Sequence, residues 1–239
     1  MNQVPKKTGL DIDLIMNQAQ EAAETYIDFS QEKVDSIVAA TYEALFNQRV
    51  QLAKMAHEET GIGLWEDKVT KNVIASKYLY EDIKDQKTVG IIREDEERML
   101  VEVAKPIGTI FSITPITNPT STAIFKILIA LKTRNPIIIR PHGAAKKSTI
   151  ATVKIAYEAA LLAGAPLHCI QWIKRSTPEQ TLEMMAHRKV ALVFATGSVS
   201  LVRSAYKSGN PAIGGGPGNV PGYIGKSADI PFAVNQILL

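Results

Sequence analysis

Apolar residues recur at three- and four-residue steps through the first third of the chain, a spacing typical of amphipathic helices. Between residues 11 and 83 this pattern predicts helices and no strand. Ser30 is placed to cap one helix, Gly61 to end a second, and a third extends from about residue 66 to residue 83. No chemistry is visible in this part of the chain.

The period then changes to two, which is typical of strands. Residues 89–92 and 99–104 alternate in polarity around an acidic turn at residues 94–97, and together they predict a β-hairpin over residues 89–104. A lone hairpin is only marginally stable in water. We therefore expect the hairpin to pack against another subunit or against a part of the protein outside this sequence.

From residue 107 onward, predicted strands and helices alternate. The strands fall at residues 107–113, 137–140, 169–173 and 190–195, with short ones near Ala212 and Tyr223, and the helices at residues 119–131, 145–163, 178–186, 199–207 and 230–239. Helical crossovers of this length join parallel strands, so the pattern predicts a doubly wound α/β sheet of the nucleotide-binding type, with helices on both faces. The last helix has no terminal cap, which suggests a cut chain.

Composition narrows the class of protein. With 239 residues, 46% hydrophobic and 21% charged, the chain is typical of an ordinary globular protein. The net charge of +3 comes with no basic stripe, so we expect no nucleic-acid partner. The most apolar stretch, residues 123–139, is interrupted by Lys126, Lys132 and Arg134, so we expect no membrane insertion. A single cysteine, Cys169, favours a reducing compartment such as the cytoplasm.

Ligands of open parallel sheets bind beyond the carboxyl ends of the strands, which makes the residues after each strand candidates. In residues 114–122, Asn118 is a good helix cap and Pro119 suits the first helical position. The same geometry lets an amide and free N–H groups stabilise an oxyanion or a phosphate. Both interpretations are compatible.

Three further segments follow predicted strands. Each could be part of a binding site or simply an ordinary turn. Residues 140–143 supply donors for ribose or phosphate, and residues 195–198 let backbone amides approach a ligand closely. Residues 214–221 are rich in glycine, but Val220 breaks the phosphate-loop pattern before residues 225–227, and Asn219 breaks the three-glycine dinucleotide pattern. A dinucleotide would therefore be bound by another arrangement.

The sequence gives little support for a metal site or for a nucleophilic cysteine. The four histidines, His57, His142, His168 and His187, have no ligand spacing, so we expect no metal site. Cys169 lies in a predicted apolar strand, where a cysteine usually behaves as a small buried hydrophobe. We do not expect it to be a nucleophile.

Several long motifs resemble the CoA-acylating aldehyde dehydrogenases, and most closely the N-terminal half of bifunctional aldehyde-alcohol dehydrogenases. The resemblance covers almost the whole chain and is specific. It is carried by residues 113–115, 117–126, 131–135, 141–142, 163–166, 195–197, 205–206, 208–209, 211–214, 218–219 and 221, and by the helical region 68–76.

The resemblance implies an oxidoreductase that converts a small aldehyde, coenzyme A and NAD to an acyl-CoA and NADH, with NADP also possible. In the family a cysteine thiolate attacks the aldehyde, and an asparagine that matches Asn118 stabilises the oxyanion. Residues 214–219 hold no acid that could activate water, which agrees with transfer to coenzyme A. Matched motif by motif, the resemblance implies that the cofactor cleft is lined by Thr114, Pro115, Arg140, Pro141, His142, Gly197, Ser198 and Gly214.

The implied organisation is one NAD-binding domain over residues 1–239, Rossmann-like and truncated. It has a helical part at residues 10–86, a homo-oligomerisation hairpin at 89–104 and an α/β part at 107–239. The family's nucleophilic cysteine follows the helix that begins near Asp229, so we expect the catalytic cysteine domain to be absent and this chain alone to be inactive. Gly215, Pro217 and residues 199–200 depart from the family pattern.

Two other hypotheses stay open. One is a non-catalytic nucleotide-binding or assembly subunit that uses the hairpin as its contact surface. The other is a decayed remnant that folds poorly. Neither requires an acyl-transfer reaction.

Overall fold

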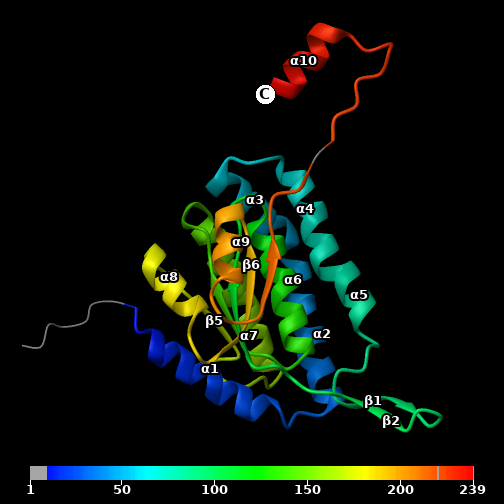
Figure 1. Cartoon of the computed structure of the whole chain (residues 1–239), viewed down its shortest axis with the longest axis vertical. Coiled ribbons are helices and arrows are strands. Elements are labelled where there is room, and N and C mark those ends of the chain that lie inside the picture. Colours follow the sequence, from blue (N-terminus) through cyan, green and yellow to red (C-terminus); the bar gives the residue numbers. More distant parts are fainter. Residues whose placement is uncertain (1–9, 220, 239) are drawn as a thin grey trace, which may run out of the picture.

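The chain folds around a five-stranded parallel sheet (Figure 1), described here from a computed structural model that covers residues 10–219 and 221–238. The strand order is β5-β4-β3-β6-β7. The strands are β3 (Thr109–Ile113), β4 (Ile137–Arg140), β5 (Ile170–Trp172), β6 (Val190–Thr196) and β7 (Ala212–Gly215). The chain winds outward from β3 to β5 and then returns to β6 on the other side of β3. This order confirms the predicted doubly wound sheet and places its switch point between β3 and β6.

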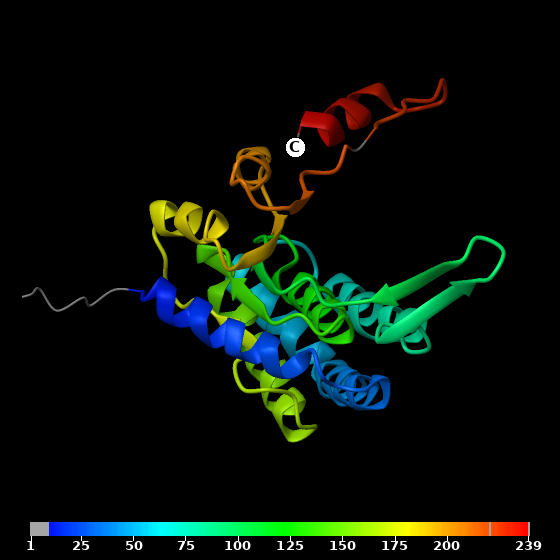
Figure 2. The same cartoon turned by 60° about the horizontal axis from the view of Figure 1, so that its bottom comes forward.

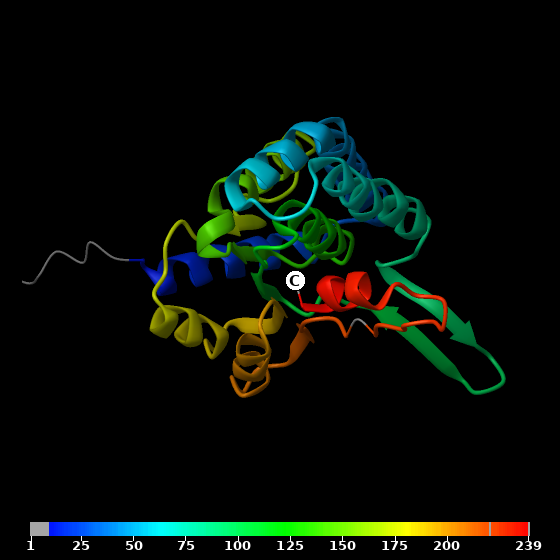
Figure 3. The ribbon, with the colours of Figure 1, turned by 90° about the horizontal axis from the view of Figure 1, so that it is seen from above.

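Helices cover both faces of the sheet because successive strand residues point to opposite sides (Figure 3). Ile110, Ile137 and Ile139 enter one core, and Phe111 and Ile138 enter the other. The first face is covered mainly by α2 (Gln31–Asn47), α3 (Arg49–Thr60), α6 (Pro119–Lys132) and α7 (Lys146–Leu162). The second face is covered mainly by α1 (Ile12–Tyr26), α8 (Pro178–Met185) and α9 (Val199–Tyr206).

The helical first third matches the pattern, with more breaks than expected. Ser30 caps α2 through a 3.3 Å hydrogen bond that its Oγ accepts from the backbone N of Lys33. Gly61 ends α3 with a left-handed φ of 66°, as predicted, but Gln48 separates α2 from α3. The next helical stretch is α4 (Trp65–Val73), a π-helical turn η1 (Ile74–Tyr78) and α5 (Leu79–Ile83).

The predicted hairpin is present and projects from the body as β1 (Gly90–Asp95) and β2 (Leu100–Ala104) (Figure 2). Its turn falls at residues 96–99, two residues later than predicted, because Asp95 Oδ1 accepts a 3.0 Å hydrogen bond from the backbone N of Arg98. At the base, Gln31 Oε1 accepts hydrogen bonds of 2.8 and 3.1 Å from the backbone N of Thr88 and Val89. The base is thus fixed, whereas the apolar side chains of the arm are exposed.

The segment after β7 departs from one prediction. The short strand expected near Tyr223 is wrong, because residues 221–225 form no strand and have no neighbour in the sheet beyond β7. The final helix, α10 (Ile230–Leu238), stands apart from the sheet in Figure 1, and none of its described side chains is buried. Within residues 10–219 and 221–238, no helix has the length and apolarity needed to cross a membrane.

Candidate functional site

A cavity of about 770 Å³ lies at the carboxyl edge of the sheet, over the switch point between β3 and β6. Its size falls within the usual range of small-molecule sites, roughly 300–1,000 Å³. The loops after β3, β4, β6 and β7 converge there because these four strands are neighbours. The lining residues are Ile113 to Asn118, Thr122, Arg140, His142, Thr196 to Ser198, Leu201 and Gly215 to Gly218.

Most of the predicted site residues line this cavity. They are Thr114, Pro115, Asn118, Arg140, His142, Gly197 and Ser198. Pro141 is buried and lines a smaller pocket beside Arg140 instead. Gly214 also lies outside the lining: a Cβ there would clash with Val202, and its backbone N donates a 3.1 Å hydrogen bond to the hydroxyl of Tyr206. Gly214 therefore packs β7 against α9.

Gly215 was missed by the sequence reasoning, although it lines the cavity. It pairs with Thr196 in the β6–β7 register, whereas Gly214 pairs with Ala195. Neighbouring strand residues face opposite sides, so one of two adjacent glycines had to face away from the site. The sequence alone did not show which of the two glycines faces the cavity.

Thr114 carries a polar group that has no protein partner. Its side chain is 1% exposed, and Oγ1 is among the buried side-chain atoms without a hydrogen bond. A buried hydroxyl without a partner costs free energy, on the order of 1–3 kcal/mol. Thr114 also lines the cavity, although Oγ1 itself is buried, so a rotation of the side chain would bring this hydroxyl to a polar ligand.

The first turn of α9 opens into the cavity. Ser198 caps the helix through a 3.3 Å hydrogen bond that its Oγ accepts from the backbone N of Leu201, and Gly197 precedes it. Aligned peptide dipoles and free N–H groups make such a helix start favourable for anions. This end of the cavity suits a phosphate group.

The first turn of α7, by contrast, already holds an anion from the protein. The Glu59 carboxylate, reaching over from α3, accepts hydrogen bonds of 2.6 Å from the backbone N of Lys147 and 2.7 Å from that of Ser148. The Ser148 hydroxyl donates a third, also of 2.7 Å. Of the two helices that follow β4 and β6, α9 is therefore the one open to an anionic ligand.

Asn118 occupies the cap position of α6 without capping it through its side chain. Its Oδ1 instead accepts a 3.1 Å hydrogen bond from Lys71 Nζ, and its Nδ2 donates one of 3.2 Å to Thr117 Oγ1. Lys68 supports the same loop by donating to the Thr117 carbonyl at 3.0 Å. Burial, and then the neighbouring Lys71 charge, lower the pKa of Lys68.

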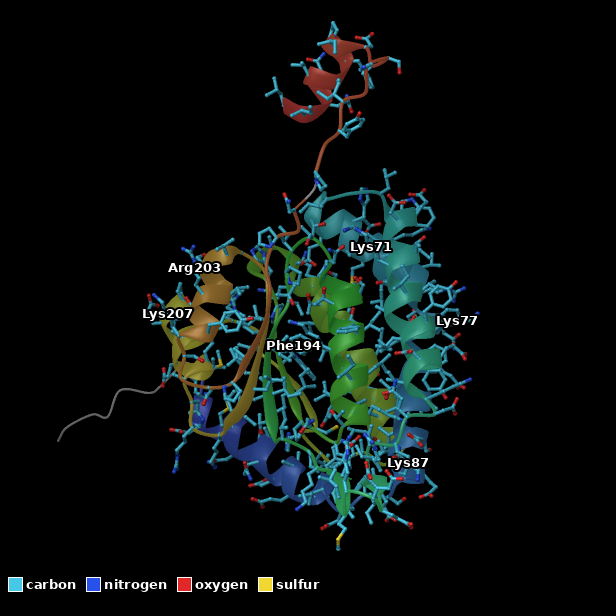
Figure 4. All side chains as sticks on the ribbon, turned by 45° about the vertical axis from the view of Figure 1, so that its right-hand side comes forward. Lys71, Lys77, Lys87, Phe194, Arg203 and Lys207 are labelled. Carbon is cyan, nitrogen blue, oxygen red and sulfur yellow. The ribbon has the colours of Figure 1, made fainter. Side chains whose placement is uncertain are left out.

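A second cavity, of about 600 Å³, adjoins the first and shares Asn118, Thr122 and Thr196 with it. It lies between the α4–α5 stretch, α6 and β6, and its walls include Lys71 and Phe194, both labelled in Figure 4. Its other walls are largely apolar: Ile74, Ala75, Tyr78, Leu79 and Phe125. The Asn118 amide thus stands at the junction of two cavities.

Lys126 joins β3 to β6 beneath this junction. Its Nζ donates hydrogen bonds of 2.8 Å to the Ile113 carbonyl and 2.7 Å to the Phe194 carbonyl, and it lies 4.4 Å from the centre of the Phe194 ring. Burial lowers the pKa of Lys126 to about 7. Sequence reasoning missed this role because a lysine within an apolar helix gives no sign of its tertiary partners.

Cys169, the single cysteine of the sequence, lies outside both cavities. It is fully buried, and burial raises the pKa of its thiol to about 12. A thiol with such a pKa stays protonated at neutral pH and is a poor nucleophile.

Comparisons with known proteins agree with the resemblance found in the sequence. The aldehyde dehydrogenase family profile matches residues 1–238. Aldehyde-alcohol dehydrogenase 2 of Entamoeba histolytica is 45% identical over 95% of this chain, and the acetylating succinate-semialdehyde dehydrogenase of Clostridium kluyveri is 40% identical over 94%. The chain spans 26% of the first relative's length and 49% of the second's.

A solved structure is also similar. The acetylating aldehyde dehydrogenase of Geobacillus thermoglucosidasius superposes with a TM-score of 0.86 and 46% identity, over 95% of this chain and 50% of that one. The resemblance to acylating enzymes is thereby confirmed. The chain belongs to the aldehyde dehydrogenase family.

Proposed function

We propose that this chain is the cofactor-binding part of an acylating aldehyde dehydrogenase that converts an aldehyde, coenzyme A and NAD to an acyl-CoA and NADH. The observation that carries the proposal is the junction at Asn118, where a cavity open to a helix N-terminus meets a second, mostly apolar cavity. The first suits a dinucleotide and the second an aldehyde chain. Bound NAD would supply the hydride acceptor.

The residues of the first cavity have the chemistry that a dinucleotide needs. Gly197 and Ser198 at the start of α9 would hold the diphosphate, and the unpartnered Thr114 hydroxyl would make a hydrogen bond to the cofactor. Pro115, Arg140 and His142 would line the remainder of the cleft. Pro141 and Gly214 would shape it indirectly, through neighbouring residues.

Asn118 is the candidate for transition-state stabilisation. Because Lys71 donates to Oδ1 and one N–H of the amide donates to Thr117 Oγ1, the second N–H is left for further donation. An NH₂ group fixed in this way could donate to an oxyanion that forms on the aldehyde oxygen. The thiol nucleophile would come from outside this sequence, since the only cysteine is the buried Cys169.

The buried thiol also favours a second candidate function, a nucleotide-binding subunit without acyl-transfer activity of its own. In either case we propose that the hairpin β1–β2 mediates homo-oligomerisation, because Ile91, Val101 and Val103 expose apolar surface on an arm fixed at its base. A single cysteine further favours the cytoplasm as the compartment.

Calorimetric titration of the chain with NAD and then NADP tests the cofactor assignment. We expect saturable binding of at least one of them, with a stoichiometry of about one per chain. Absence of binding to a folded sample, as judged by a cooperative thermal melt, would overturn it. A parallel assay for NADH formation from acetaldehyde and coenzyme A tests the assignment of Cys169. Under either function we expect no turnover by the chain alone, because its only thiol is buried, and activity at neutral pH would contradict the assignment of Cys169 as inert.

A further inference from the structure

An open groove of about 820 Å³ lies along the outer edge of the sheet, between α7 and β5. β5 is the last strand on this side of the sheet, so no further strand covers the groove in the part of the chain that the structure describes. The α7–β5 groove shares no lining residue with the two cavities that meet at Asn118. The proposed function therefore leaves it unused.

The floor of the groove is apolar and aromatic. Ile150 and Tyr157 line it from α7, and Ile170 and Trp172 line it from β5. The rings of Tyr157 and Trp172 pack edge to face, with their centroids 5.9 Å apart. Both side chains are only half-buried, so each keeps surface for a ligand. Tyrosine and tryptophan are among the residues that contribute most to the affinity of protein–protein contacts.

Four cations surround this floor. Lys146 and Lys154 come from α7, and Lys174 and Arg175 follow β5. Within the described residues, none of the four belongs to an ion pair, and no carboxylate lines the groove. The cations are spread along the groove, because Lys154 lies about two turns beyond Lys146 on α7. Such a surface is complementary to a ligand that carries several separate negative charges.

The length of the groove indicates a chain-like ligand. From Lys146 to Tyr157, α7 advances by roughly 16 Å, which about five residues of extended peptide would span. Alternate side chains of an extended peptide point to opposite sides, so apolar ones can lie on the floor while acidic ones face the cations. A nucleic-acid strand would need open ring faces for stacking, whereas the Tyr157 and Trp172 rings pack against each other.

We propose that the α7–β5 groove docks an extended acidic segment of a partner protein. Its apolar side chains lie against Ile150 and Trp172, and its carboxylates pair with the surrounding lysines and arginine. Residues 1–9, which precede the lining residue Leu10, contain Lys6 and Lys7 and no acid, so charge disfavours them as the occupant.

Two matched peptides test the proposal in titrations of the full chain. One peptide, of about eight residues, alternates acidic side chains with Leu and Phe, and the other replaces every Asp by Asn and every Glu by Gln. We expect the acidic peptide to bind about ten-fold or more tightly, with an affinity that falls as salt is added. Equal binding of the two peptides, or binding of neither, would overturn the proposal.

Tryptophan fluorescence locates the bound peptide. The sequence contains two tryptophans, Trp65 and Trp172, so Trp65→Phe leaves the ring in the groove as the sole tryptophan emitter. The emission of this variant should shift as the acidic peptide saturates it. A peptide that binds without changing the emission lies elsewhere, and the proposal then fails.

Matched double variants test the charge complementarity. Lys154→Gln with Lys174→Gln removes two exposed cations of the groove and should weaken binding of the acidic peptide about ten-fold. Lys77→Gln with Lys87→Gln removes the same charge from exposed positions outside the groove (Figure 4) and should change the affinity by less than about two-fold. Equal losses in both double variants would show that net charge alone attracts the peptide, which would overturn the assignment.

Two further measurements distinguish other occupants. Sedimentation velocity should give the same oligomeric state for the unmodified chain and for the groove double variant. Loss of self-association in that variant would assign the groove to a second copy, whose acidic residues 94–97 could enter it. A single-stranded oligouridylate should not displace the acidic peptide, and displacement by it would assign the groove to nucleic acid. Either contrary result overturns the proposal.

Discussion

Lys71 Nζ donates a 3.1 Å hydrogen bond to Oδ1 of Asn118, and this contact joins α4 to the start of α6. A side-chain amide can rotate so that its oxygen and nitrogen exchange places, and only a fixed partner selects one orientation. Lys71 selects the orientation in which the oxygen is used inside the protein. One N–H of the amide donates to Thr117 Oγ1, and the other remains for a ligand. The supporting loop is held by a second lysine, Lys68, at the Thr117 carbonyl.

Replacing this lysine should free the amide. In Lys71→Met we expect the side-chain NH₂ signals of Asn118 in a ¹H–¹⁵N spectrum to shift and to become more equivalent, because the oxygen loses its charged donor. Unfolding free energy should change by less than about 0.5 kcal/mol, since Lys71 is exposed. Lys77→Met removes a comparable charge from the same helical stretch, outside both cavities, and should leave the Asn118 signals unchanged. Equal shifts in both variants would contradict the contact's role.

The Thr114 hydroxyl should contribute directly to cofactor affinity. Thr114→Val keeps the shape and removes the hydroxyl, so we expect NAD to bind about ten-fold more weakly in calorimetry. Thr109 provides the control: it is also 1% exposed with an unpartnered Oγ1, but it lies at the amino end of β3, away from the cavity. Thr109→Val should bind NAD like the unmodified chain. Unaltered affinity in Thr114→Val would remove this residue from the site.

Gly214 should matter for packing. An added Cβ would clash with Val202 and crowd the Tyr206 ring at 3.0 Å, so Gly214→Ala should destabilise the chain by about 1–3 kcal/mol in urea unfolding. At Gly222 an added Cβ would meet nothing within 4 Å, and Gly222→Ala should change stability by less than about 0.5 kcal/mol. Equal stability of the two variants would mean that β7 does not pack against α9 in this way.

Lys126 should make stability depend on pH. Burial lowers its pKa from 10.5 to about 7 in the folded chain, so between these values the unfolded chain binds more protons. Unfolding free energy should therefore rise with pH through this window, by at most about 1.4 kcal/mol per unit, relative to Lys126→Met. Urea unfolding at pH 7, 8 and 9 measures the difference between the two proteins. A difference that stays constant with pH would show that Lys126 is solvated in the folded chain.

The arrangement of strands and helices was predictable because it follows from local periodicity. Ile137 to Arg140 and Pro178 onward were placed correctly since short apolar runs and proline starts carry their own signals. The strand near Tyr223 failed for the opposite reason: a strand exists only where another strand pairs with it, and residues 221–225 have none.

Site residues were predictable where a motif fixes the backbone conformation. They were less predictable where contacts between distant parts of the chain determine the side chain's role. Thr114, Asn118 and Gly197 follow strands, so their place at the carboxyl edge follows from topology. Lys71 and Lys126 carry charges that usually face solvent, and only the folded chain reveals that one donates to Asn118 and the other to two buried carbonyls. A helix cap at Asn118 was expected from residue type, but Lys71 competes for that oxygen.

A crystal structure of the chain soaked with NAD tests the central claim most directly. We expect a dinucleotide at the carboxyl edge between β4 and β6. Its diphosphate should lie against the backbone N–H groups of the first turn of α9, and Thr114 Oγ1 should be hydrogen-bonded to it. A nucleotide bound only away from this edge of the sheet, or well-ordered crystals that show none at saturating NAD, would contradict this assignment.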